Sequence, residues 1–146
     1  MSGTQPGGLR VFSIGSNSLT EVSGSPYSTG GTGPSAILPT ADGSFVYVAN
    51  KAVSGSSTGN ISGYPVNLSG GKYSLGTVIN TIAAGTSTAG LAEDNTKTYV
   101  LAINSGGSPD LNNYTFDATT SGKLDAGATA ATGTDPVTAT AIVAVP

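Results

Sequence analysis

The stretch PSAILPTADGSFVYVAN, residues 34–50, decides the fold. It contains two apolar runs, residues 35–39 and 45–49, on either side of the turn Ala41-Asp42-Gly43-Ser44. An Asp-Gly pair between apolar runs predicts a β-hairpin, because Gly adopts the positive φ of a tight turn without steric cost. The second run, FVYVA, does not alternate between polar and apolar residues. It therefore predicts a strand that is covered on both faces.

The same unit returns later in the chain. Residues 31–50, GTGPSAILPTADGSFVYVAN, align without gaps on residues 85–104, GTSTAGLAEDNTKTYVLAIN, at a shift of 54. Weaker matches continue in the same order: Tyr64 with Tyr114, Gly71-Lys72 with Gly122-Lys123, Phe12 with Tyr64, Leu19 with Tyr73, and Gly133-Thr134-Asp135-Pro136 with Gly31-Thr32-Gly33-Pro34.

A period near 50 residues with four strands in it predicts β-propeller blades. We expect an all-β chain of antiparallel four-stranded blades, a partial propeller of about two and a half blades in a single repeat domain. The alternative is a β-sandwich or β-solenoid whose Ser/Thr/Gly-rich strands resemble one another by composition. The expected parts are the outer half of a blade at residues 1–30, whole blades at 31–84 and 85–132, and the inner strand of a further blade at 133–146.

Individual strands are expected within these parts. In the first whole blade we predict a third strand at residues 60–67 and a fourth at 73–82. Pro65 interrupts the third strand, and because proline cannot donate to a ladder it indicates a free edge or a bulge. Residues 137–145 are expected to form the last inner strand.

These motifs resemble a known family. PTADGSFVYVAN, followed by a polar loop, NISGYPVN, SGGKYSLG and a GT-x-P restart, is similar to the lactonase family of seven-bladed β-propellers, which includes 6-phosphogluconolactonase-like proteins and secreted bacterial members. The resemblance implies the propeller fold and, as an activity, hydrolysis of a sugar lactone. Active members are expected to use His, Arg and Glu around the central channel. This chain has no His, and Arg10, Glu21 and Glu93 stand in no matching motif, so no site residue is carried over.

Composition limits the function classes. Only 9% of the 146 residues are charged, against about 25% in ordinary soluble domains. The five basic residues, Arg10, Lys51, Lys72, Lys97 and Lys123, are spread singly, so we expect no nucleic-acid partner. No apolar run approaches the ~20 residues of a membrane span. Residues 1–10 lack the apolar core of a signal peptide, so secretion would require a leader already removed. Richness in Ser, Thr and Gly favours an extracellular or cell-envelope protein.

Candidate site residues are few. Without His or Cys we expect no catalytic constellation, no metal site and no cofactor, and the binding residues stay unknown. Glu93-Asp94 could offer a carboxylate or a weak Ca²⁺ site, but a solvated turn is the simpler interpretation. The same holds for residues 110–113, DLNN.

The positions of the aromatic residues favour packing in the core over binding of a sugar. They fall at shared repeat positions, Phe12, Tyr64 and Tyr114 at one and Phe45 and Tyr99 at another, which predicts core packing. Exposed Tyr could instead stack on glycans. The glycosylation sequons at Asn60, Asn67 and Asn113 are unremarkable in a chain so rich in Asn, Ser and Thr.

The incomplete ring suggests the function. A partial propeller leaves apolar blade faces and strand edges open at its two ends. Such ends could associate head to tail through blade faces and terminal strands, giving a homo-oligomeric ring or a filament. The hypothesis is a non-catalytic repeat module that works by self-assembly or surface binding. The alternatives are the C-terminal part of a lactonase-like enzyme and a carbohydrate-binding module.

Overall fold

The computed structural model describes residues 6–130 and 140–144, and this part of the chain contains β-strands and no helix. The strands are β1 (Pro6–Leu9), β2 (Phe12–Ile14), β3 (Leu19–Glu21), β4 (Tyr27–Pro39), β5 (Phe45–Ala52), β6 (Thr58–Ser69), β7 (Lys72–Leu75), β8 (Asn80–Thr86), β9 (Thr88–Glu93), β10 (Tyr99–Asn104), β11 (Leu111–Phe116) and β12 (Leu124–Ala130).

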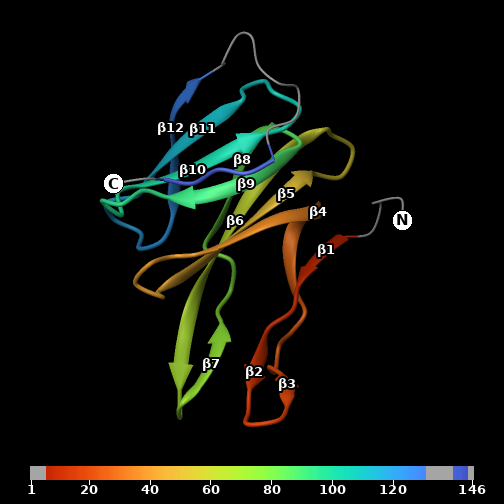
Figure 1. The fold of residues 1–146 in the computed structure, drawn as a ribbon, viewed down its shortest axis with the longest axis vertical. Helices are drawn as coiled ribbons and strands as arrows, with labels where there is room; N and C mark the ends of the chain where they lie inside the picture. Colours follow the sequence, from red (N-terminus) through yellow and green to blue (C-terminus); the bar gives the residue numbers. More distant parts are fainter. Residues whose placement is uncertain (1–5, 131–139, 145–146) are drawn as a thin grey trace.

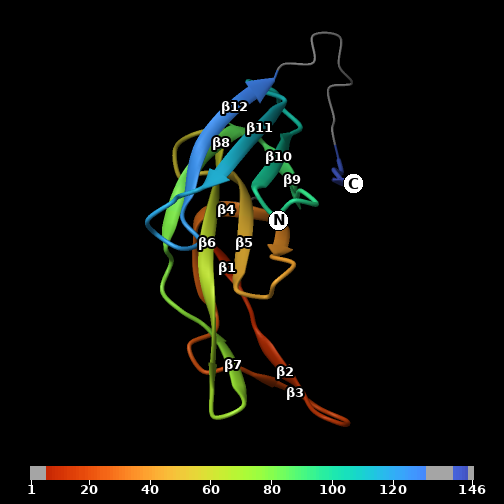
Figure 2. The ribbon, with the colours of Figure 1, turned by 90° about the vertical axis from the view of Figure 1, so that its left-hand side faces the viewer.

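The strands form antiparallel sheets (Figure 1). A strongly curled sheet has the order β1-β4-β5-β6-β7, and β8 pairs with β6 beside this path. A second sheet has the order β12-β11-β10-β9, and β2 pairs with β3 in a separate hairpin. The β2–β3 and β6–β7 hairpins project from the same end of the molecule (Figures 1 and 2). The prediction of an all-β fold with antiparallel, blade-like sheets is confirmed. The second sheet has four strands, whereas the first has six, because β1 extends it beyond β4 and β8 pairs with β6. We refer to β4–β7 as the first blade and to β9–β12 as the second.

The turn between β4 and β5 forms as its residues predict. The backbone N–H of Thr40 donates to the Phe45 carbonyl at 2.9 Å. The Asp42 carboxylate accepts the Thr40 hydroxyl at 2.6 Å and the Ser44 backbone N–H at 2.9 Å. Gly43 has a φ of 73°, a backbone conformation that is sterically unfavourable for residues with a side chain. The turn is therefore held by the short polar side chains at its ends.

The turn between β9 and β10 repeats this arrangement with two residue types exchanged. Asp94 stands at the position of Thr40, and Thr96 at that of Asp42, and their side chains again hydrogen-bond to each other. The Asp94 carboxylate also accepts the backbone N–H of Tyr99 at 2.6 Å. Lys97 takes the place of Gly43 and keeps a positive φ of 57°. The repeat thus extends to the details of its turns.

The run FVYVA is covered on both faces, as predicted. Tyr47 and Ala49 belong to the core between the two blades, and Val48 belongs to a second cluster on the opposite face of the first blade, with Leu9 and Tyr64. Tyr47, Val48 and Ala49 are fully buried. Since neighbouring side chains on a strand point to opposite faces, this burial requires a cover on each side of β5.

The prediction of a single strand at residues 73–82 is wrong. This stretch forms parts of two strands, β7 and β8, and residues 76–79 between them do not pair in the ladder. Pro65 on β6 is the physical cause, because it has no N–H for the ladder. Its carbonyl accepts the Gly76 N–H at 2.9 Å, and a Cβ built on Gly76 would lie 2.7 Å from the Pro65 ring.

The last predicted strand is only partly within the described residues. Residues 137–139 and 145 lie outside them, and residues 140–144 have no strand pairing. Ile142 nevertheless lies against β9: a Cβ built on Gly90 would be 3.4 Å from its side chain.

Candidate functional site

A small cleft lies where three turns meet. It has a volume of about 210 Å³ and lies between the β4–β5 turn, the β9–β10 turn and the loop that joins β11 to β12. Carboxylate, ammonium, hydroxyl and aromatic side chains line it: Thr40, Asp42, Phe45, Glu93, Lys97, Phe116, Asp117, Ser121 and Gly122. This volume is below the ~300–1,000 Å³ of typical ligand pockets.

The carboxylates of the cleft are engaged in structural hydrogen bonds. Glu93 accepts the backbone N–H of Ala41 at 2.7 Å and so joins the second blade to the first. The Thr40 hydroxyl, together with the Ser44 N–H, lowers the pKa of Asp42 to about 2. Asp42 and Glu93 thus hold turns in place.

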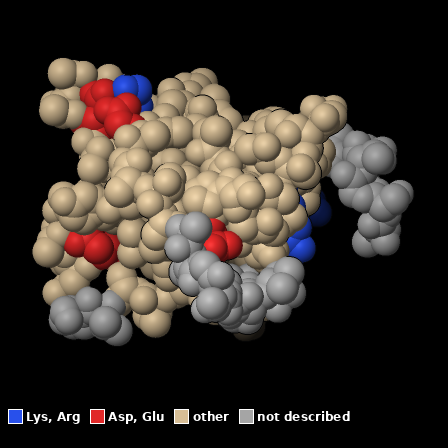
Figure 3. All heavy atoms as spheres, turned by 90° about the horizontal axis from the view of Figure 1, so that it is seen from above, with Lys and Arg blue, Asp and Glu red and all other residues tan. Residues whose placement is uncertain are grey.

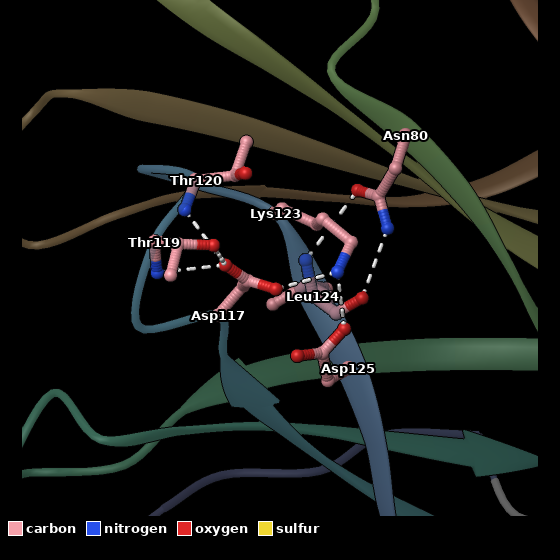
Figure 4. A network of polar contacts seen from close by, with 7 residues as sticks. All are labelled: Asn80, Asp117, Thr119, Thr120, Lys123, Leu124 and Asp125. Atoms are coloured by element: carbon pink, nitrogen blue, oxygen red, sulfur yellow. Dashed lines mark hydrogen bonds and ion pairs between the residues drawn. The ribbon is translucent and has the colours of Figure 1, made fainter.

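Asp117 accepts hydrogen bonds from the side chains of Lys123 and Thr119 and from the backbone N–H of Thr120 (Figure 4). The Lys123 ammonium contacts it at 2.6 Å and also contacts Asp125 at 2.7 Å. Hydrogen bonds from Lys123, and then from Thr119 and Thr120, hold the pKa of Asp117 far below its usual range. Lys123 thus closes the loop before β12.

Asn80 continues this network across the sheets. Its side chain donates to the Leu124 carbonyl at 2.9 Å and accepts the Leu124 N–H, so β8 is joined to the start of β12 (Figure 4). These polar contacts anchor the loop between β11 and β12 and are structural.

The cleft offers little chemistry. Ser121 is its hydroxyl nucleophile, and since the chain has no His, a Ser-His-Asp arrangement cannot activate it. Within the described part of the chain, no three side chains of the metal-ligating types gather into a site.

The other sequence candidates prove structural. Asp94 holds its own turn, and the Thr96 hydroxyl lowers its pKa to about 2. Of residues 110–113, Asn112 is buried and accepts the side-chain amide of Asn104 at 2.7 Å. Asn60 is likewise buried and accepts the amide of Asn50 at 2.7 Å, so the Asn60 sequon is closed to modification in the folded chain.

The aromatic positions divide between core and surface. Tyr64 and Tyr114 are buried with 2% and 1% exposed, which confirms the prediction of core packing for them. Phe12, at the same repeat position, is 42% exposed, so the prediction is wrong there. Phe45 is half-buried, whereas its counterpart Tyr99 is exposed. The physical reason is that, in the described residues, the faces carrying Phe12 and Tyr99 lack a complete blade packed against them.

A larger, apolar groove runs along the first blade on the face opposite the core. It has a volume of about 360 Å³ and is lined by the N-terminal strands and by β4–β7: Leu9, Arg10, Val11, Phe12, Ile37, Val46, Val66, Tyr73, Ser74 and Leu75. Arg10, the charged residue of this lining, is bound by the Glu21 carboxylate at 2.8 and 2.5 Å and lies 5.5 Å from the Phe12 ring centre. The groove therefore has no uncompensated charge.

Charged groups are sparse elsewhere on the surface. In Figure 3, Lys, Arg, Asp and Glu occupy a few separate spots on a largely uncharged face. Among residues 6–130 and 140–144 there is no helix long and apolar enough to cross a membrane. The sequence analysis expected open apolar blade faces at the ends of a partial ring, but it did not identify the residues of this groove.

The comparisons with known proteins returned no match: no family model, no curated protein and no solved structure is significantly similar to this chain.

Proposed function

We propose that this chain is a non-catalytic repeat module that works through association at the faces of its blades. The observation that carries the proposal is the large apolar surface left open on the first blade. Ile37 and Tyr73 in the groove are 58% and 63% exposed, and Phe12 beside them is 42% exposed. Contiguous exposed apolar side chains on a soluble domain mark interaction surfaces.

A second argument for the proposal is that the polar groups of the small cleft already have structural partners. The carboxylates of the small cleft are used in turns and ion pairs, and no His or Cys exists to activate Ser121. Catalysis needs a nucleophile or base held near its reaction partner, with groups placed for the charge that develops. Association requires an exposed apolar surface, and the groove supplies one.

The alternative proposal is that the chain is part of a lactonase-like propeller enzyme, as the sequence resemblance implies. It predicts hydrolysis of a sugar lactone by this chain above the rate of a buffer control. Absence of turnover, together with self-association, favours the repeat module.

A carbohydrate-binding module is a further candidate, because Tyr73 and Phe12 line the same groove and both are exposed. Aromatic faces stack on sugars, so glycan binding would quench Tyr fluorescence in the chain and less so in Tyr73→Ala. The low charge and the richness in Ser, Thr and Gly lead us to propose an extracellular or envelope setting for any of these functions.

The proposed function is tested by the sedimentation of the unmodified chain over a wide concentration range. The weight-average mass should rise above the 14.2 kDa of one chain as concentration increases. A mass that stays at one chain at every concentration, with no other partner bound, would overturn the proposal.

A further inference from the structure

The two blades pack against each other within the chain through two different faces. Tyr47 on the first blade lies with its ring centre 6.2 Å from that of Phe116 on the second blade. The Tyr47 hydroxyl donates to the Gly122 carbonyl at 2.7 Å. Around this contact, one face of β5 packs against Val100 and Leu124 of the second blade, all within a single core. The first blade therefore offers one face and the second blade receives it with the opposite face.

The receiving face also exists on the first blade, and there it is open. Four apolar side chains of the groove on β4–β7 hold the repeat positions of side chains that the second blade packs into the internal interface. The pairs are Ile37 with Leu91, Val46 with Val100, Val66 with Phe116 and Tyr73 with Leu124. The contrast is sharp for the last pair, because Leu124 is 2% exposed and Tyr73 is 63% exposed.

The offering face exists on the second blade as well. Val100 and Ala102 point into the core, so the alternating residues Tyr99, Leu101 and Ile103 lie on the opposite face of β10. They hold the repeat positions of Phe45, Tyr47 and Ala49, the residues with which the first blade meets the second. Tyr99 is 38% exposed.

We infer that the groove of one chain binds the Tyr99–Leu101 face of a second copy of the same chain, repeating the internal interface between copies. The inference rests on the proposed function and names its two surfaces. Leu101 of one copy then lies over Val66 and Gly71 of the other, as Tyr47 lies over Phe116 and Gly122. Because the two surfaces differ, the contact is head to tail and produces a ring if the rotation closes or a filament if it does not.

The neighbouring segments cover part of each surface. On the second blade, Ile142 lies against Gly90 beside Ile103, which is 8% exposed, so the open part of that face is the end at Tyr99. Leu9 and Val11 pack against the cluster of Val48 and Tyr64, so they cover only part of the receiving face. The part around Ile37 and Tyr73 stays exposed. Arg10 at the groove is neutralised by its ion pair with Glu21, so no unpaired charge would face an apolar partner there.

Two substitutions that introduce a charge test each of the two surfaces on its own. Ile37→Lys places a charge in the groove, and Tyr99→Lys places one on the opposite face, both at exposed positions that should leave folding intact. Each variant alone should bind itself at least about tenfold more weakly than the unmodified chain, because an unpaired charge at an apolar contact costs more than one tenfold step. Val78→Lys, at a 48% exposed apolar position in the bulge before β8, is the matched control and should associate normally.

Mixing the two variants gives the decisive result. Ile37→Lys keeps its Tyr99 face, and Tyr99→Lys keeps its groove, so an equimolar mixture should form a 1:1 heterodimer that stops at two chains. A mixture that remains monomeric overturns the head-to-tail inference. If the unmodified chain associates and neither variant weakens it, the inference fails while the proposed function stands. If the unmodified chain never associates, the proposed function itself fails.

Discussion

Replacing Leu124 by Ala tests the equivalence of the two blades through stability. Leu124 is 2% exposed in the core between the blades, where Tyr47 and Tyr114 also lie. Truncating a buried Leu removes its transfer free energy and leaves a cavity, which costs about 2–5 kcal/mol. For a chain of this length, each kcal/mol lowers the melting temperature by about 2–4 °C, so a loss near 3 kcal/mol means a fall of about 6–12 °C.

Tyr73→Ala is the matched control, since Tyr73 holds the same repeat position and is exposed. Its effect on the free energy of unfolding should stay within about 0.5 kcal/mol. Both variants are compared with the unmodified chain by urea unfolding followed by circular dichroism, at dilution low enough that association does not contribute. Equal losses for Leu124→Ala and Tyr73→Ala would refute the reasoning, because the two positions would then be buried alike.

Three further changes follow from the same contacts. Tyr47→Phe leaves the Gly122 carbonyl without its buried donor and should cost about 1–3 kcal/mol in urea unfolding; a neutral result would mean that water replaces the hydroxyl. Gly85→Ala puts a Cβ 2.5 Å from both the Asn104 amide nitrogen and the Pro109 carbonyl oxygen and should destabilise by about 1–3 kcal/mol, whereas an unchanged midpoint would contradict this close contact. Asp94 has a pKa of about 2 in the folded chain against 3.8 unperturbed, so the stability it contributes is complete above pH ~4 and is lost as the pH falls toward 2. Asp94→Asn should therefore reduce the fall in melting temperature between pH 4 and pH 2. An identical fall in the variant and the unmodified chain would contradict this role of Asp94.

The sequence predicts local structure well where side chains determine the backbone directly. The Asp42-Gly43 pair predicts its turn, and the polar-free run at residues 45–49 predicts a strand covered on both faces. The ungapped match of two 20-residue stretches aligns the two turns, and the structure shows that Asp94 and Thr96 exchange the roles of Thr40 and Asp42 there. These features depend on residues close together in the chain.

The features that sequence reasoning missed depend on what lies next to each blade. Phe12 and Tyr64 share a repeat position and differ in burial, because burial is set by the neighbouring sheet and not by the strand itself. The break between β7 and β8 depends on where Pro65 falls opposite Gly76. The residues of the apolar groove could not be identified from the sequence, since Ile37 and Val46 are as apolar as their counterparts Leu91 and Val100, which pack into the core.

The solution mass of the unmodified chain, measured by light scattering over a concentration series beside the double variant Ile37→Lys/Tyr99→Lys, tests the central claim most directly. The account predicts a mass that grows with concentration for the unmodified chain and stays at 14.2 kDa for the double variant. An unmodified chain that remains at 14.2 kDa throughout the series would contradict association through the blade faces.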